Sequence, residues 1–198
     1  MLPARLILVR HGQSTYNAKA CLQGQADPPL SDAGRREAEQ LRPALVRFPD
    51  DRVVTSDLIR ARETAALLGY PDARPDPRWR EIDVGSWAGR PLTDFSTGTE
   101  YAWRGGPLHA PDGEGWEDLQ GRVGGAVDEL LGAGGTWLVV CHGGVIRAAL
   151  SHITGADATR VAGPENASVT VIRGGDPARL ETYAWTPGGL SSQVPDTV

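Results

Sequence analysis

The chain has 198 residues, 40% of them hydrophobic, and a formal net charge of −5. This length and apolar content predict a single domain over residues 1–198 with a substantial core. A nucleic-acid binder is expected to have an overall basic character and a membrane protein a long apolar stretch, and this sequence has neither. We therefore expect no nucleic-acid partner and no membrane partner, whereas the sequence does not indicate an oligomeric state.

The N-terminus and the cysteines bear on the cellular compartment. The apolar run after Arg5 is too short for the core of a signal peptide. The two cysteines, Cys21 and Cys141, lack the spacing of metal ligands, and Cys141 closes an apolar run where an inert buried thiol is expected rather than a disulfide. These features predict a cytoplasmic protein whose partners are small molecules.

Segments typical of strands and helices alternate along the chain. The predicted strands cover residues 6–9, 52–56, 136–141, 168–173 and 180–185, and the predicted helices cover 14–19, 31–48, 57–69, 114–132 and 143–155. The stretch 71–111 has no clear period and is predicted to be irregular, with a candidate edge strand inside 79–89. This alternation favours an α/β fold, a three-layer sandwich with a mostly parallel central sheet flanked by helices.

Two of the predicted strands end in the same way. "LILVRHG" runs from an apolar strand into Arg10, His11 and a glycine, and "WLVVCHGG" places His142 and Gly143 after a second apolar strand. Parallel strands share a direction, so both histidines are expected at the carboxyl edge of the sheet, where open α/β sheets bind ligands. If the strands are neighbours, one ligand can reach both rings.

A third junction adds positive charge to this edge. In "VVTSDLIRARETA" a strand leads into a helix whose first turn carries Arg60 or Arg62, and the spacing alone does not decide between them. One of these arginines, Arg10, the two histidines and the free N–H groups of helix N-termini together match an oxyanion with several charges. Phosphate is the ligand that this set predicts.

These stretches resemble the histidine phosphatase superfamily, the phosphoglycerate mutase-like proteins. The resemblance covers nearly the whole chain and rests on blocks in a fixed order: "LVRHGQSTYN", "QGQADPPLSDAG", "TSDLIRARETA", "WREIDVGSWAG", "PDGEGWEDLQGRV" and "VVCHGGVIRAAL". One departure is the glutamine of "RHGQS", where many members carry glutamate; it leaves the core set of residues intact.

The resemblance implies a role for each site residue. It implies that His11 is the nucleophile, that Arg10, Arg60 and His142 hold the phosphoryl group, and that Glu81 is the proton donor. It also selects Arg60 over Arg62. Four further positions match residues that contact phosphate or substrate in the family, although the motifs around them are less specific: Asn17, Gln23, Gly24 and Gly143.

The implied chemistry fits these residue types. Neutral imidazole is unprotonated at neutral pH and is not repelled by a dianion, which suits His11 as the attacking group. Nearby cations stabilise the moving phosphoryl group, and no metal and no cofactor are expected. Glu81 lies among apolar residues, which favours its acid form, but the sequence alone equally allows a surface carboxylate paired with Arg78 or Arg80.

Other reactions fit the sequence less well. A metallohydrolase would place a divalent cation beside Arg10, and the chain has no HxH or HExxH cluster. A cysteine hydrolase using Cys141 and His142 fails because neighbouring strand residues face opposite sides. A binding module without catalysis remains as an alternative, although every expected catalytic position is filled.

The resemblance also favours the phosphatase branch over the mutase branch. Mutases of the family are typically longer and carry "YG-x-L-x-G" where this chain has "EIDVGSWAGRPL". We expect a phosphomonoesterase for a small phosphorylated metabolite, with a cofactor-dependent phosphoglycerate mutase as the alternative. Aromatic residues that could wall an apolar substrate pocket, or pack in the core, are Phe95, Tyr101, Trp103, His109 and Trp116.

Overall fold

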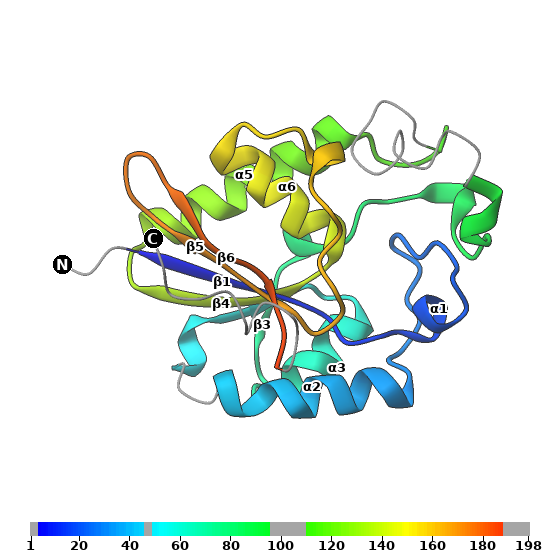
Figure 1. Cartoon of the computed structure of the whole chain (residues 1–198), viewed down its shortest axis with the longest axis horizontal. Coiled ribbons are helices and arrows are strands. Elements are labelled where there is room, and N and C mark those ends of the chain that lie inside the picture. The colour runs from blue at the N-terminus through cyan, green and yellow to red at the C-terminus, as the bar shows by residue number, and fades with distance from the viewer. Residues whose placement is uncertain (1–3, 46–48, 96–109, 188–198) are drawn as a thin grey trace.

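The computed structural model describes residues 4–45, 49–95 and 110–187. Its centre is a six-stranded sheet in the order β3-β2-β4-β1-β5-β6 (Figure 1). The strands are β1 (Arg5–Arg10), β2 (Val53–Thr55), β3 (Arg74–Pro75), β4 (Thr136–Cys141), β5 (Val169–Arg173) and β6 (Arg179–Trp185). Strands β3, β2, β4 and β1 pair in parallel, and β5 is antiparallel to both of its neighbours. The predicted mostly parallel sheet is confirmed.

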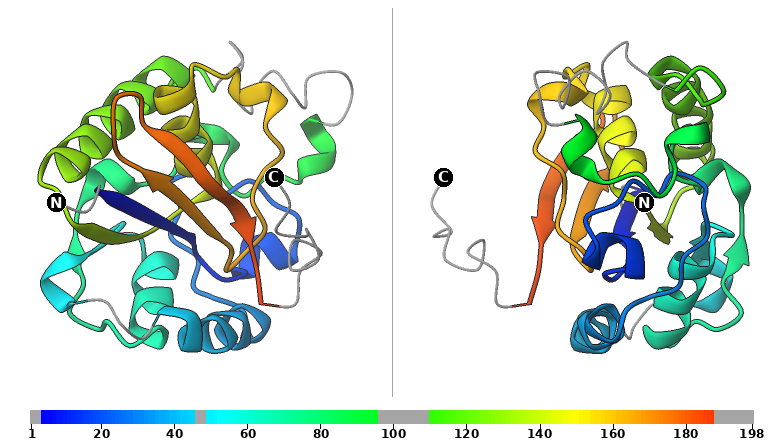
Figure 2. Two further views of the ribbon diagram at one scale, coloured as in Figure 1. Left: turned by 60° about the vertical axis from the view of Figure 1, so that its left-hand side comes forward. Right: turned by 90° about the vertical axis from the view of Figure 1, so that its right-hand side faces the viewer.

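Helices cover both faces of this sheet. On one face lie α2 and α3, and on the other lie α5 and α6, so the molecule has three layers (Figures 1 and 2). The helices are α1 (Thr15–Ala18), α2 (Asp32–Leu45), α3 (Ile59–Leu67), α5 (Trp116–Gly132) and α6 (Gly143–Thr154). The three-layer sandwich predicted from the sequence is therefore confirmed. In the described ranges no helix combines the length and the apolar character that a membrane crossing needs.

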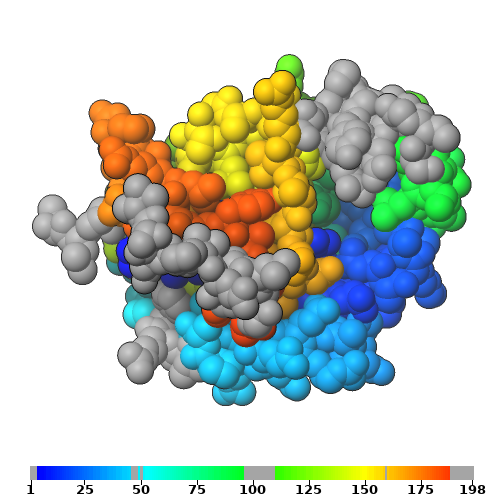
Figure 3. All heavy atoms as spheres, viewed as in Figure 1, coloured from blue at the N-terminus to red at the C-terminus, as the bar shows by residue number. Residues whose placement is uncertain are grey.

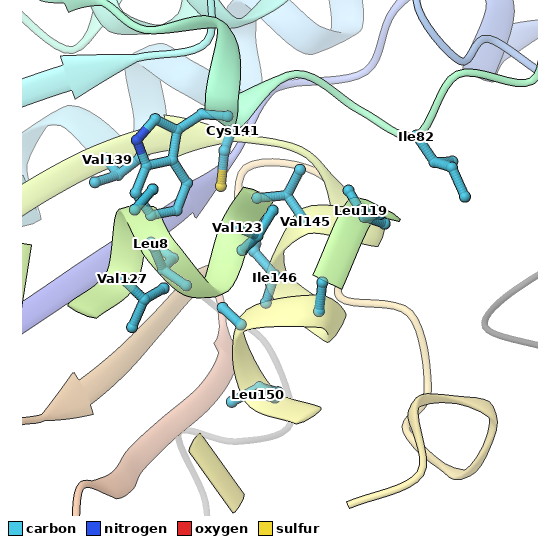
Figure 4. Packing of buried hydrophobic residues seen from close by; sticks show 14 of the residues in the cluster. Leu8, Ile82, Leu119, Val123, Val127, Val139, Cys141, Val145, Ile146 and Leu150 are labelled. Carbon is cyan, nitrogen blue, oxygen red and sulfur yellow. The ribbon is translucent and has the colours of Figure 1, made fainter. Parts of the chain in front are cut away.

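Strand β1 contributes to the core on both faces. Leu6 and Leu8 belong to the cluster beneath α5 and α6, part of which Figure 4 shows, whereas Val9 belongs to the cluster beneath α2 and α3. Successive strand residues point to opposite faces, so a strand covered on both sides must be apolar throughout. This is why "LILV" is an unbroken apolar run that yields to polar residues where the sheet ends.

The predicted edge strand within 79–89 is wrong. The segment forms the 3-10 turns η2 (Pro77–Trp79) and η3 (Gly85–Trp87), and the edge strand is β3, just before it. The carbonyl groups of Arg78, Arg80 and Glu81 accept hydrogen bonds from the side chain of Arg122, at 2.8, 2.7 and 3.0 Å. A side chain of α5 thus takes the acceptors that a neighbouring strand would have used.

The aromatic residues of the irregular stretch have different positions. Phe95 is buried in the core and packs on Trp87, with the ring centroids 5.0 Å apart, so it does not wall a substrate pocket. Trp116, at the start of α5, lines the cavity at the carboxyl edge of the sheet that is described below. Tyr101, Trp103 and His109 lie outside the described residues.

Candidate active site

The two strand-end histidines lie side by side. Strands β1 and β4 are parallel neighbours, and their register places Arg10 opposite Cys141. The next residues, His11 and His142, are therefore adjacent, with ring centroids 5.1 Å apart and the rings edge to face. Both side chains are buried, at 2% and 0% exposure. This arrangement agrees with the sequence prediction that the ends of the two strands bring both histidines to one edge of the sheet.

Both ring nitrogens of His11 are engaged. Nδ1 lies 2.6 Å from the carbonyl oxygen of Gly12, and Nε2 lies 3.3 Å from Nε of Arg60. A guanidinium can only donate, so Nε2 is the acceptor and Nδ1 carries the proton that Gly12 accepts. Burial lowers the pKa of His11 well below its ordinary value, and the charges of Arg60 and Arg10 lower it further. The ring is thus neutral at pH 7, with a lone pair on Nε2.

His142 differs, because one of its ring nitrogens is not engaged. Nε2 lies 2.8 Å from Oγ of Ser56, which also accepts the N–H of Leu58 at 3.3 Å. We assign the hydroxyl proton to Nε2, because a buried hydroxyl donor needs an acceptor. In this assignment Nδ1 carries the ring proton, and it is buried without a hydrogen-bond partner among the described residues. Burial lowers the pKa of His142 well below its usual value, and the charge of Arg60 lowers it further. A buried donor in this state fits a ligand oxygen.

The structure separates the two candidate arginines of α3. Arg60 is fully buried, and its terminal nitrogens donate to the carbonyl groups of Ala26 and Gly24, both at 2.8 Å. Arg62 is exposed. Burial lowers the pKa of Arg60 to about 10, and the nearby carboxylate of Glu81 opposes that shift, so the guanidinium remains charged at neutral pH. Arg60, not Arg62, faces His11.

Glu81 lies beside the first turn of α6, the helix that follows His142. Its Oε2 accepts the N–H of Gly144, in the first turn of α6, at 3.1 Å, and its Oε1 accepts the N–H of Ile82 at 2.9 Å. The alternative pairing with nearby arginines is absent among the described residues, because Arg78 binds Asp76 and Glu129 and Arg80 binds Asp57. The carboxyl group therefore remains at the cavity.

The remaining predicted residues occupy the rim of the site. Oδ1 of Asn17 accepts from the backbone of Ser14 at 3.1 Å, and Oε1 of Gln23 accepts from its hydroxyl at 2.5 Å. Gly24 has a positive φ of 52°, and a Cβ there would lie 2.8 Å from the backbone nitrogen of Val84, so a side chain does not fit. Gly143 begins α6, directly after His142.

A cavity of about 590 Å³ lies over this site, and the two buried histidines lie beneath its wall rather than among its lining residues. It lies between the carboxyl edge of the sheet and the segments that follow α1 and α6. The lining residues that matter for the chemistry are Arg10, Asn17, Gln23, Gly24, Arg60, Glu81, Gly143 and Gly144. The described residues include no group of three or more His, Cys, Asp or Glu side chains placed to hold a metal ion.

Sequence reasoning missed three residues that hold the site together. Ser56 orients His142, Gly144 binds Glu81, and Arg122 holds the backbone of Glu81 while it pairs with Glu114 at 2.6 Å. Gly144 could have been noticed, because it stands in the repeated strand-histidine-glycine pattern. No sequence signal marks Arg122, which lies inside a helix and acts on a distant segment.

Comparisons with known proteins agree with this geometry. The model of the histidine phosphatase superfamily (branch 1) matches residues 6–185. A glucosyl-3-phosphoglycerate phosphatase of Mycolicibacterium vanbaalenii is 33% identical over 205 residues, which cover 91% of this chain and 91% of the relative. A probable phosphoglycerate mutase of Cronobacter sakazakii is 33% identical over 165 residues, 78% of this chain and 76% of that protein.

A solved structure extends the agreement to the fold. The mycobacterial glucosyl-3-phosphoglycerate phosphatase in complex with VO3 is similar with a TM-score of 0.82 at 31% identity, over 92% of this chain and 99% of that chain. The predicted family and the predicted phosphatase class are thus confirmed. The chain belongs to branch 1 of the histidine phosphatase superfamily.

Proposed function

We propose that this enzyme hydrolyses small phosphorylated metabolites by passing the phosphoryl group first to Nε2 of His11 and then to water. The observation that carries this proposal is the state of the His11 ring. Its Nδ1 is fixed on Gly12, its burial keeps it neutral, and its lone pair lies beside the charge of Arg60. A neutral nitrogen next to a fixed cation is suited to attack a phosphate dianion.

The surrounding donors would hold the transferred group. Arg10 and Arg60 supply two positive charges, the unpartnered Nδ1–H of His142 supplies a buried donor, and Gly143 supplies an N–H at the start of a helix. These groups are fixed before substrate binds, so little reorganisation is needed in the transition state. Asn17 and Gln23 lie farther along the same wall and would touch the rest of the substrate.

Glu81 would move the protons. As the bond from phosphorus to His11 forms and the bond to the leaving oxygen breaks, the protonated carboxyl gives its proton to the departing alkoxide. Water then attacks the phosphohistidine, Glu81 takes the proton of the water, and the bond between phosphorus and nitrogen breaks. The residue ends in its starting state, so the cycle closes without a metal or another cofactor.

Hydrolysis is favoured over phosphoryl transfer between hydroxyl groups. The relatives named glucosyl-3-phosphoglycerate phosphatase align over 91% to 95% of this chain, whereas those named probable phosphoglycerate mutase align over 76% to 78%. We further propose that residues 1–198 act as a single cytoplasmic domain, which is supported by the one six-stranded sheet that the described residues form and by two cysteines that are both free thiols.

The test is phosphate release from a panel of phosphomonoesters in the presence of a chelator. The panel includes glucosyl-3-phosphoglycerate, 3-phosphoglycerate and nitrophenyl phosphate. We expect phosphate from at least one metabolite without added metal. In a second assay, 3-phosphoglycerate with a bisphosphoglycerate primer should yield free phosphate faster than 2-phosphoglycerate. Isomerisation faster than phosphate release would favour the phosphoglycerate mutase. Loss of phosphate release in the chelator would favour a metallohydrolase. No turnover of any substrate would favour a binding module without catalysis.

A further inference from the structure

The proposed proton donor lies on a stretch of chain that is neither helix nor strand. Glu81 belongs to residues 80–84, between the 3-10 turns η2 and η3. Such a stretch has no regular ladder of backbone hydrogen bonds to fix its position. A group that transfers a proton must lie within hydrogen-bond distance of the atom that it serves, and a displacement of roughly 1 Å can lower a rate about a hundredfold. The position of Glu81 therefore depends on contacts from another part of the molecule.

The guanidinium of Arg122, on α5, supplies such contacts. Its Nη1 donates to the carbonyl groups of Arg78 and Arg80, and its Nη2 donates to the carbonyl group of Glu81. The remaining donors meet one carboxylate, because Nε lies 2.6 Å from Oε1 of Glu114 and Nη2 lies 2.8 Å from Oε2. Each of the five N–H groups of the guanidinium thus has an acceptor, which fixes the plane of the side chain.

Glu114 holds the same stretch at a second point. Its backbone N–H donates to the carbonyl group of Asp83 at 2.8 Å, and its Oε2 accepts the N–H of Asp83 at 3.2 Å. Glu81 is therefore held on both sides by one ion pair. The neighbour of Arg122 on α5, Val123, is fully buried in the core cluster (Figure 4), so this ion pair is attached to a helix that is packed in the core.

We propose that Arg122, anchored by Glu114, is a positioning residue for the proton transfer: it holds the backbone of Glu81 so that the carboxyl group reaches the leaving oxygen. This inference rests on the proposed phosphatase function and names a residue on which its acid–base step depends. Arg122 does not line the cavity, two of whose walls are visible in Figure 3 as the blue region around α1 and the gold segment after α6. Arg122 therefore acts through Glu81 and not on the substrate.

The leaving group distinguishes a positioning role from a structural one. R122M should lower kcat/KM about ten- to hundredfold for the alkyl phosphate that the wild-type enzyme hydrolyses fastest, because the misplaced acid no longer protonates the alkoxide. The ratio kcat/KM reports the step that forms the phosphoenzyme, so the later attack of water does not obscure the comparison. With nitrophenyl phosphate, whose leaving group hardly needs a proton, the fall should be less than about threefold. Equal falls with the two substrates would overturn the proposal.

A double variant tests whether Arg122 acts through Glu81. E81Q already lacks the proton that Arg122 is proposed to place. Adding R122M to E81Q should therefore lower kcat/KM for the alkyl phosphate by less than about threefold, a smaller loss than R122M causes alone. Independent contributions would multiply, so the same further loss in E81Q as in the wild type would show that Arg122 acts by another route and would contradict the proposal.

Two milder variants separate this effect from a loss of the fold. R122K keeps a charge opposite Glu114 but cannot span the carbonyl groups, and E114Q keeps the bonds to the carbonyl groups but weakens the anchor. Both should show the same dependence on the leaving group as R122M, with a smaller fall in kcat/KM, and thermal unfolding should show that they are folded. A folded R122K or E114Q that loses equal activity with both substrates would contradict the positioning role.

The matched control is E129Q. It breaks another contact between this stretch and α5, the ion pair of Glu129 with Arg78 at 2.6 Å, and leaves Arg122 in place. It should change kcat/KM for neither substrate, and a fall that depends on the leaving group would show that Arg122 has no particular role. Failure of the proposed function looks different, because the wild-type enzyme would then release phosphate from no alkyl phosphate and not from nitrophenyl phosphate.

Discussion

The β1 and β4 junctions use the same pattern of residues and differ in what surrounds each histidine. At the end of β1, His11 has a partner on each ring nitrogen, Gly12 on one side and Arg60 on the other. At the end of β4, His142 has Ser56 on one nitrogen and no partner on the other among the described residues. The first ring presents a lone pair beside a cation, and the second presents a buried N–H. An identical sequence pattern thus gives one candidate nucleophile and one candidate hydrogen-bond donor.

The difference arises from the elements that pack against each junction. The residues that follow β1 meet α3: Arg60 reaches the ring of His11 at 3.3 Å, and Thr64 accepts the N–H of Gly12 at 3.1 Å. Strand β4 leads directly into α6, whose first turn binds Glu81 through Gly144. The proposed nucleophile and the proposed proton donor are therefore held by different junctions, and substitutions at each should have separable effects.

The largest expected effect is that of His11→Ala. We expect kcat to fall by more than about ten thousandfold with every phosphomonoester, because the substitution removes the atom that bonds to phosphorus. Circular dichroism and thermal unfolding should show a folded protein, although the lost side chain is buried. Residual activity within a hundredfold of the wild type would show that another residue attacks phosphorus.

Glu81→Gln tests the junction that holds the proton donor. The variant keeps the shape of the side chain and loses the proton, so activity on alkyl phosphates should fall about a hundred- to ten-thousandfold. Nitrophenyl phosphate should be affected much less, since its leaving group hardly needs protonation. Equal losses with both substrates would indicate that Glu81 only supports the structure.

His142→Ala should have a smaller effect than His11→Ala. It removes one donor to the phosphoryl group and leaves the bond-forming atom in place, so we expect a fall of about a hundred- to a thousandfold in kcat. The variant should still form a phosphoenzyme in a rapid-quench experiment. If His142→Ala and His11→Ala were equally inactive and neither formed a phosphoenzyme, the two rings would not have the separate roles proposed here.

The smallest expected effect is on the pH dependence of stability. Both histidines have a pKa lowered in the folded state, mainly by burial, whereas the unfolded chain protonates near pH 6.5. Stability is therefore complete above pH 6.5 and falls as the pH drops below it, because the unfolded state binds protons that the folded state excludes. His142→Asn should reduce the loss of unfolding free energy between pH 7 and pH 5 by about 1–2 kcal/mol. Urea titrations at the two pH values measure this, and an unchanged loss would contradict the buried neutral state.

Much of the fold and of the site followed from local patterns. Apolar runs that end in His11 and His142 located β1, β4 and the edge where their side chains meet. The family resemblance selected Arg60, and burial of its side chain agrees with that choice. These features could be predicted because each depends on a strand, a helix and the residue at its end.

The features that were missed depend on contacts between distant segments. The turns around Glu81 replace the expected strand because Arg122, on α5, takes their carbonyl groups. Ser56 meets His142 across 86 positions of the chain, and no period in the sequence marks that pair. Such contacts form only when the layers pack together, so the local sequence does not indicate them.

Trapping the phosphoenzyme tests the central claim most directly. The enzyme is mixed with a substrate labelled on phosphate, denatured in alkali within the first turnover, and digested to locate the label. We predict a single labelled residue, His11, with a bond that is stable in alkali and lost in acid, as a phosphoramidate is; the label should persist in His142→Ala and be absent in His11→Ala. A label on His142, on a serine or on a cysteine would contradict the account.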